Sequence, residues 1–387
     1  MIAYTHKDFF MGFFMPTRKE PSINLPTSDR SSTGHKGERV EAGEATLGPI
    51  GIKFSGNARE YFGIWIVNLI LTIVTLGVYS AWAKVRREIY FKNNTRIFDS
   101  SLGYHATGGQ IFKGRLIAFV VLVVVNIISS IQPIFGIVMV PLFIALLPWI
   151  LNSSLRFSAR MTSFRNIRLN WHGTYWRTMW FLVIAPLVGL LTLGLLTPLI
   201  SKHYYSYFAR SHSYRTTRFS ANPKVSQFYL AFLLGGIIPT IVVGCAVIII
   251  LTILAELSGS SMIGSSQTIW AAIPMLIYVF VFSMAFIYAV MCRNIMMKSL
   301  TLENILTFDS QINPLKFVWI SLSNLFLALL SLGLLLPWAK VRMYKYLSAV
   351  TFVTAIGNID TFTDELNSNR SALGEAAADF EGVEVSI

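Results

Sequence analysis

A tryptophan followed by two basic residues occurs twice in this chain, each time where an apolar run ends. The pentapeptide Trp-Ala-Lys-Val-Arg stands at 82–86 and again at 338–342. Tryptophan concentrates at the headgroup level of a bilayer, and a neighbouring lysine or arginine favours the cytoplasmic side, so the motif suits an interfacial anchor. The same cations also suit an anionic lipid headgroup or another anionic ligand. The candidate contacts are Trp82, Lys84, Arg86, Arg87, Trp338, Lys340 and Arg342.

Two asparagines form a second repeated feature. Asn68 and Asn324 stand at corresponding places in the apolar runs that precede the two motifs. A carboxamide in an apolar setting is costly unless it finds a hydrogen-bond partner, which most often lies on a neighbouring helix. Alternatively, the two amides line a polar path through the membrane. Both interpretations make them a candidate intramembrane polar pair.

Residues that could support catalysis or hold a metal are not grouped in the sequence. Both cysteines lie inside apolar runs without a CxxC or CxxH neighbour, which indicates neither a disulfide framework nor a zinc site. Four histidines show no metal-ligand spacing: His105, His172, His203 and His212. No catalytic set of serine, cysteine or carboxylate is evident either, although such sets assemble in space. We therefore expect no metal, no cofactor and no enzymatic activity.

The composition indicates whether this chain lies in water or in a membrane. Hydrophobic residues make up 54% and charged residues only 13%, with a mean hydropathy of +0.58, whereas a soluble domain carries about 25% charged residues. Residues 202–219 interleave bases with aromatics, as single-stranded nucleic-acid sites do. An amphipathic interfacial helix has the same composition. The expected partners are thus the lipid bilayer and anionic phospholipid headgroups, and not nucleic acid.

Several apolar stretches approach the roughly 20 residues that a membrane-spanning helix needs. They lie at 62–82, 116–131, 134–151, 178–200, 229–254, 268–292 and 316–337. Short polar segments with strand character separate them. We therefore expect an all-α integral membrane protein, a bundle of about seven apolar helices or re-entrant segments with short cytoplasmic β-strands.

The tryptophan motif belongs to a longer repeat. Gly77 corresponds to Gly333 and Tyr90 to Tyr346, and a weaker copy at 192–208 aligns with both. Such recurrence predicts a module that occurs two and a half times. The predicted divisions are a disordered polar leader at 1–50, module one at 51–151, module two at 152–292, a partial module three at 293–354, and an acidic disordered tail at 355–387.

The stretch from Phe54 to Ile97, FSGNAREYFGIWIVNLILTIVTLGVYSAWAKVRREIYFKNNTRI, with YHATGGQIFKGRLIA after it and PWAKVR near the end, resembles the YjgN family of bacterial inner-membrane proteins. The resemblance covers about residues 52–355. It implies a multi-pass protein of the bacterial inner membrane, and it implies no established activity. The weaker middle copy departs from the motif, because Ser201 and His203 replace the Lys84 and Arg86 of the first copy.

The positions of the bases set the expected topology. Net charge is +13, and the loops at 83–115, 152–177 and 201–227 are all basic, whereas 255–267 holds no base. Seven simple spans would place 201–227 outside, against the positive-inside bias. The conflict disappears if 62–82, 178–200 and 316–337 enter and leave on the cytoplasmic side. Re-entrant segments and inverted repeats both remain open at this point.

Two functions follow from these features. The first is a carrier or channel for a small or lipid-like solute, and the alternative is a non-catalytic membrane-organising or anionic-lipid-binding protein. Proton-driven carriers usually place a carboxylate or histidine at mid-membrane depth. Glu60 and Glu256 lie only at the ends of apolar runs, which weighs against proton coupling. A membrane enzyme acting on lipid-linked substrates has the least support.

Overall fold

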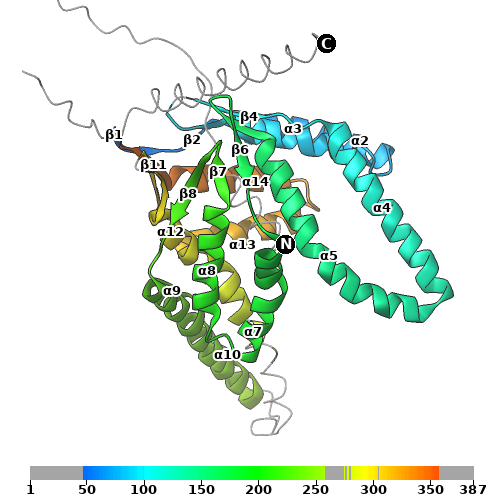
Figure 1. The fold of residues 1–387 in the computed structure, drawn as a ribbon. Helices are drawn as coiled ribbons and strands as arrows, with labels where there is room; N and C mark the ends of the chain where they lie inside the picture. The colour runs from blue at the N-terminus through cyan, green and yellow to red at the C-terminus, as the bar shows by residue number, and fades with distance from the viewer. Residues whose placement is uncertain are drawn as a thin grey trace, which may run out of the picture.

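The computed structural model describes residues 47–98, 100–257, 274, 277–278, 280–303 and 305–356. In this part of the chain, the strands gather at one end, and two long helical hairpins extend away from them and diverge (Figure 1). Each helical excursion leaves from one strand and returns to a strand paired with it. The strands are therefore the common base from which all the described helices start and to which they return.

Nine of the described strands form one antiparallel sheet in the order β1-β11-β10-β9-β8-β7-β6-β5-β4. Their bounds are β1 Leu47–Gly51, β4 Leu102–Tyr104, β5 Thr162–Phe164, β6 Ile167–Trp171, β7 His212–Tyr214, β8 Thr217–Ala221, β9 Leu300–Leu302, β10 Leu306–Ser310 and β11 Thr351–Ala355. A separate pair joins β2 (Lys53–Phe54) to β3 (Thr95–Arg96). The described residues are mostly helical, as expected for a membrane protein, but the expected short strands combine into one large antiparallel sheet, which an all-α bundle does not contain.

Three of the predicted apolar runs are broken in the middle. The run at 62–82 becomes α2 (Ala58–Val74), a turn, and α3 (Ser80–Asn93). The run at 316–337 becomes α13 (Pro314–Leu330), a turn, and α14 (Leu336–Ala349). Between them in sequence, the run at 178–200 gives α6 (Tyr175–Met179), a π-helix (Trp180–Ile184) and α7 (Ala185–Leu191), then a turn and α8 (Thr197–Arg210). We call these three units the broken hairpins.

Two further excursions are longer and form the hairpins that extend from the sheet in Figure 1. The first consists of α4 (Gly108–Ile131) and α5 (Pro133–Arg160). The second consists of α9 (Val225–Phe232), a π-helix (Leu233–Ile237) and α10 (Ile238–Leu257), with a π-helix (Met284–Tyr288) and α12 (Ala289–Lys298) on the return. Within the described residues, four helices are long and apolar enough to cross a membrane: Gly108–Ile131, Ile134–Arg160, Val225–Ile250 and Phe280–Lys298.

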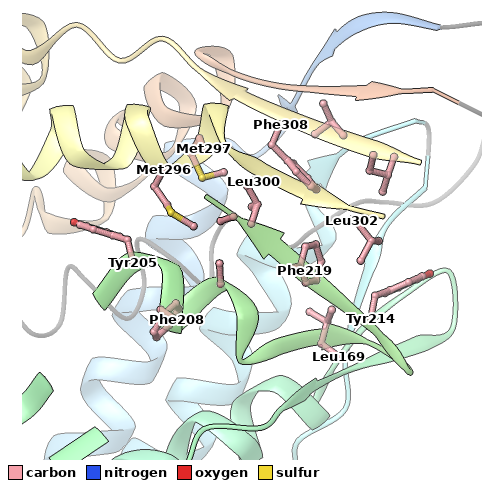
Figure 2. Packing of buried hydrophobic residues seen from close by; sticks show 14 of the residues in the cluster. Leu169, Tyr205, Phe208, Tyr214, Phe219, Met296, Met297, Leu300, Leu302 and Phe308 are labelled. Carbon is pink, nitrogen blue, oxygen red and sulfur yellow. The ribbon is translucent and has the colours of Figure 1, made fainter. Parts of the chain in front are cut away.

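The largest buried cluster lies where the sheet meets α8 and α12. Figure 2 shows Met296 and Met297 of α12 and Phe208 of α8 beside Leu300 and Phe219 of the strands. These side chains are 7% exposed or less. Because alternate strand residues face this cluster, the sheet and the inner ends of the helices form one hydrophobic core.

A smaller cluster joins the first broken hairpin to the third. Tyr61 and Phe91 pack with Val341, which stands inside the second copy of the tryptophan motif. The Tyr344 ring centroid lies 4.8 Å from that of Phe91 and 4.9 Å from that of Phe54. The beginning and the end of the described chain are thus held together by aromatic packing.

The predicted ends of the chain fall largely outside the described residues. Of the expected leader at 1–50, the structure describes 47–50, and these belong to β1, which pairs with β11. Of the expected tail at 355–387, it describes Ala355 at the end of β11 and Ile356. The described residues of both segments belong to or adjoin paired strands, and the rest of the two predicted end segments lies outside the described residues.

Candidate functional site

The turn of each broken hairpin places the tryptophan motif on the returning helix. In the first hairpin, Leu76 has φ +48° and Gly77 has φ +91°. The Gly77 N–H donates to the Thr72 carbonyl oxygen at 2.7 Å, and the Thr75 hydroxyl donates to the Leu71 carbonyl oxygen at 2.7 Å. These bonds satisfy backbone groups within the turn itself. A turn of this kind tolerates an apolar environment, in which unsatisfied backbone groups are costly.

The turns of the other two broken hairpins repeat this geometry. Leu193 and Leu332 have φ of +50° and +49°, and each is followed by a glycine with positive φ. The Gly333 N–H donates to the Ala328 carbonyl oxygen at 2.7 Å, as the Gly77 N–H does to Thr72. Leu76 and Leu332 are both 95% exposed. Each turn therefore exposes a leucine side chain at its tip. An exposed leucine is more favourable in hydrocarbon than in water.

In the third broken hairpin, the basic motif meets Asn324. The Arg342 Nη1 group donates to the Asn324 Oδ1 atom at 3.1 Å and to the Ser323 hydroxyl oxygen at 2.8 Å. The Arg342 guanidinium also lies 5.1 Å from the ring centroid of Trp338. The Asn324 Nδ2 group donates to the Ala339 carbonyl oxygen at 3.1 Å. The Asn324 side chain thus links α13 to α14 by hydrogen bonds.

The first broken hairpin arranges the corresponding residues differently. Asn68 is 7% exposed, and its Oδ1 atom has no hydrogen-bond partner among the described residues. Arg86 instead lies 5.7 Å from the Tyr79 ring centroid and lines a pocket of about 590 Å³. That pocket also contains Glu60. The Glu60 carboxylate therefore offsets part of the positive charge inside this pocket.

Trp82 connects the first broken hairpin to the first long one. Its ring centroid lies 5.7 Å from that of Phe112. A Cβ atom added at Gly108 would stand 2.3 Å from the Trp82 Cδ1 atom, so the ring rests directly on the start of α4. The Arg115 Nη1 group donates to the Ser80 hydroxyl oxygen at 2.5 Å. Trp82 is nevertheless 37% exposed, as is Trp338.

The remaining predicted contacts do not converge on one point. Arg87 forms an ion pair with Glu88 at 3.1 Å. Lys84 is half-buried on α3, and Lys340 is exposed on α14. The structure therefore brings Trp338, Arg342 and Asn324 together, whereas the cations of the first copy spread around α3.

Sequence reasoning missed a second basic cluster. Arg156 and Arg160 on α5 lie near Arg218 on β8 and His172 after β6, and all four line a pocket of about 560 Å³. The available signal was an arginine pair four residues apart on a helix, in a region without acids. The contribution of Arg218 depends on the pairing of β6, β7 and β8 and has no local sequence signal.

Two buried cations were also missed, and both have structural partners. Lys92 is 3% exposed; its ammonium group donates to the Thr162 hydroxyl oxygen at 2.7 Å and lies 4.2 Å from the Tyr104 ring centroid. Arg293 is 4% exposed and donates to the Ser310 hydroxyl and, at 3.1 Å, to the Thr351 hydroxyl. Each cation links a helix to the sheet.

Comparison with known proteins finds relatives named as inner membrane proteins. Inner membrane protein YjgN of Salmonella typhimurium is 23% identical over 364 residues, covering 83% of this chain and 91% of the relative. The proteins of the same name from Escherichia coli O157:H7 and K12 are 32% and 31% identical over 142 and 141 residues, in each case 35% of both chains. No solved structure matches the chain.

The family comparison covers more of the sequence. A model described as "Bacterial protein of unknown function (DUF898)" matches residues 49–380. The relatives named YjgN and the four apolar helices together place the protein in the bacterial inner membrane. Because the family model matches most of the chain, from the first described strand into the acidic tail, the chain belongs to the DUF898 family of bacterial proteins.

Proposed function

We propose that the protein binds anionic phospholipid headgroups at the cytoplasmic face of the inner membrane and organises that face without catalysis. The observation that carries this proposal is the separation of charge along every hairpin. No charged residue occurs between Arg115 and Arg156, and only Glu256 occurs between Lys224 and Arg293. The bases stand at the strand ends of the hairpins, where the positive-inside bias and anionic headgroups favour them.

The topology in this proposal has four spans and three re-entrant hairpins. Helices α2 and α13 have 17 residues each, a length of about 25 Å at 1.5 Å per residue, whereas the hydrocarbon core is about 30 Å thick. The turns that follow them satisfy their own backbone groups and expose leucine. Each broken hairpin then enters the membrane from the sheet side and returns to it.

The internal repeat is part of the same proposal. Each broken hairpin carries the same Leu-Gly turn. The strand before each hairpin pairs with the strand after it. Modules one and two add a long hairpin and module three does not. We therefore interpret the chain as two and a half copies of one strand-and-hairpin unit.

The lipid proposal is tested by comparing two double variants that remove equal charge. Lys84→Gln with Arg86→Gln changes the first motif, and Arg96→Gln with Lys345→Gln removes two exposed bases elsewhere. The protein is reconstituted in nanodiscs of mixed phosphatidylglycerol and phosphatidylcholine, and native mass spectrometry measures the retained lipids. We expect the motif variant to lose its preference for phosphatidylglycerol and the control to keep it. If both variants show the same preference for phosphatidylglycerol, the motif acts only as a membrane anchor.

The second candidate, a carrier for a small or lipid-like solute, is favoured by the helices around Gly235 and Gly236. These residues lie in a π-helix that packs against the π-helix Met284–Tyr288, and a Cβ atom at Gly235 would stand 3.1 Å from the Tyr288 backbone. π-Helical turns occur frequently at functional sites. A fluorescent-lipid translocation assay in proteoliposomes tests this candidate. Faster transfer between leaflets than in protein-free vesicles supports it, and equal rates reject lipid transport.

A further inference from the structure

The pocket of about 560 Å³ on the sheet side of α5 is formed by three separate segments. Arg156 and Arg160 come from the last turns of α5, His172 and Thr174 from the corner between β6 and α6, and Arg218 from β8. The corner follows β6 directly in the chain. The register of the sheet therefore sets the distance between the corner and Arg218. The pocket therefore depends on the tertiary fold and not on one flexible loop.

The floor of this pocket is tightly packed. Trp171 is 3% exposed, and its Nε1–H group donates to the Asn152 Oδ1 atom at 2.9 Å. A Cβ atom added at Gly173 would stand 2.5 Å from that Oδ1 atom and 2.5 Å from the Trp171 ring. The chain can pass this close because Gly173 has no side chain. The basic side chains therefore surround a densely packed floor.

The charges around the pocket have one sign. None of its lining residues is a carboxylate; besides the three arginines they include Asn170, His172 and Thr174. The pKa of His172 is lowered by desolvation and, after that, by the positive charges of Arg218, Arg156 and Arg160. The three arginines thus line one pocket together with His172, whose Nε2 atom lies 2.9 Å from the Ser213 hydroxyl oxygen.

The corresponding corner of the third module is bridged by the side chain of Asn294. There the Asn294 Nδ2 group donates to the Ile312 carbonyl oxygen at 2.8 Å, and the Ile312 N–H donates to Asn294 Oδ1 at 3.2 Å. The strand before that corner carries Asp309. The basic pocket is thus not a general result of a strand meeting a helix in this fold.

We propose that this pocket binds a phosphate group, carried either by a lipid headgroup or by a soluble phosphorylated compound. Three guanidinium groups match the several oxygen acceptors of a phosphate and can bind them in pairs, which favours phosphate over a single carboxylate. The volume leaves space for an organic substituent as well. Trp176, 78% exposed, follows the corner closely and places the pocket near the membrane interface, within reach of both sources.

The experiment uses the full-length protein in detergent and in nanodiscs. Isothermal titration with inorganic phosphate and with glycerol phosphate tests the soluble source, and native mass spectrometry of nanodiscs containing phosphatidic acid tests the lipid source. Arg218→Gln and the pair Arg156→Gln with Arg160→Gln are expected to weaken binding about tenfold or more in whichever arm is positive, because each removes charged hydrogen bonds. Arg168→Gln, an exposed arginine on β6 outside the pocket, is the matched control.

Two further readouts separate binding from folding. Arg218→Lys keeps the charge but lacks the planar fork, so it should restore affinity only in part. In an NMR titration of labelled histidines, bound phosphate should raise the pKa of His172, because the anion offsets the neighbouring guanidinium charges. Thermal unfolding identifies any variant that has lost its fold. Arg218 lies at an exposed strand position, so Arg218→Gln is the variant least expected to unfold the protein.

Each outcome decides the proposal. Binding in one arm that the pocket variants weaken and Arg168→Gln does not supports it and identifies the source. Absence of binding in both arms overturns it, as does binding that the pocket variants leave unchanged. The Lys84→Gln and Arg86→Gln variant leaves this pocket intact, so failure of the motif proposal and failure of the phosphate proposal give different results.

Discussion

The Tyr90 hydroxyl and the Asn57 backbone hold the two ends of the first broken hairpin together. The hydroxyl accepts a hydrogen bond from the Asn57 N–H at 2.8 Å and donates one to the Asn57 carbonyl oxygen at 2.8 Å. Tyr207 bonds the Thr174 backbone in the same way, at 3.1 and 3.4 Å, and Tyr346 the Asn313 backbone, at 3.1 and 3.2 Å. All three pairs are separated by 33 residues. A tyrosine near the end of each returning helix thus bonds the residue that begins the outgoing helix.

Tyr90→Phe should lower the free energy of unfolding by about 1–2 kcal/mol, because it removes the hydrogen bonds of the hydroxyl to Asn57 and Glu60 at a side chain that is 5% exposed. Thermal unfolding in detergent measures the loss. Tyr229→Phe, on an exposed position of α9, is the control and should change little. Equal effects of the two changes would mean that the Tyr90 hydroxyl contributes nothing to the hairpin.

Gly77→Ala should destabilise the first broken hairpin by about 1 kcal/mol or more, because alanine is strained at a φ of +91°. Gly114→Ala lies inside α4, where a Cβ atom would meet nothing within 4 Å. That control should be neutral or stabilising by up to about 1 kcal/mol. The comparison of the two melting temperatures tests whether the turn, and not glycine content in general, sets the stability of this region.

The re-entrant topology predicts the labelling of two single-cysteine variants. Thr216→Cys, in the exposed turn between β7 and β8, should resist a membrane-impermeant thiol reagent in intact cells. Gln132→Cys, exposed between α4 and α5, should react with it. Both are made after Cys245→Ser and Cys292→Ala. Labelling of Thr216→Cys in intact cells would rule out the re-entrant arrangement and favour inverted repeats.

Stability should fall with pH below about 6.5 because of His212. This side chain is buried against Trp171 and Phe208, and desolvation lowers its pKa from 6.5 to about 4. Its Nδ1–H group donates to the Phe208 carbonyl oxygen at 2.8 Å. The unfolded chain takes up the proton first, so unfolding becomes easier as the pH falls, by about 2 kcal/mol between pH 7 and pH 5.

Thermal unfolding at several pH values checks this expectation. His212→Phe keeps an aromatic ring but removes the titrating group, so the loss of stability between pH 7 and pH 5 should become smaller. His203→Gln, at an exposed position of α8, is the matched control. An unchanged pH dependence in His212→Phe would assign the effect to another group.

The sequence determined the membrane character of this protein and the positions of its repeated motif, because both depend on local composition. Continuous apolar runs, bases at their ends, and the Leu-Gly pair recur within short stretches and can be recognised without the fold. In the structure, Leu76, Gly77 and their counterparts have positive φ values, so the turns that divide the apolar runs lie at the Leu-Gly pairs. The family resemblance rested on the same local motifs and is confirmed by the comparisons.

Only the tertiary structure decided how those pieces combine. Strands such as His212–Tyr214 have three residues, too few for an alternating pattern to be read, and their pairing depends on where each hairpin returns the chain. Asn324 could line a polar path or bond a neighbour, and the approach of α14 determined that it bonds Arg342 and Ala339. Arg156 and Arg218 are far apart in sequence and share a pocket because three neighbouring strands fix their separation. Long-range contacts of this kind depend on pairing and packing across the whole chain, which no local stretch of sequence encodes.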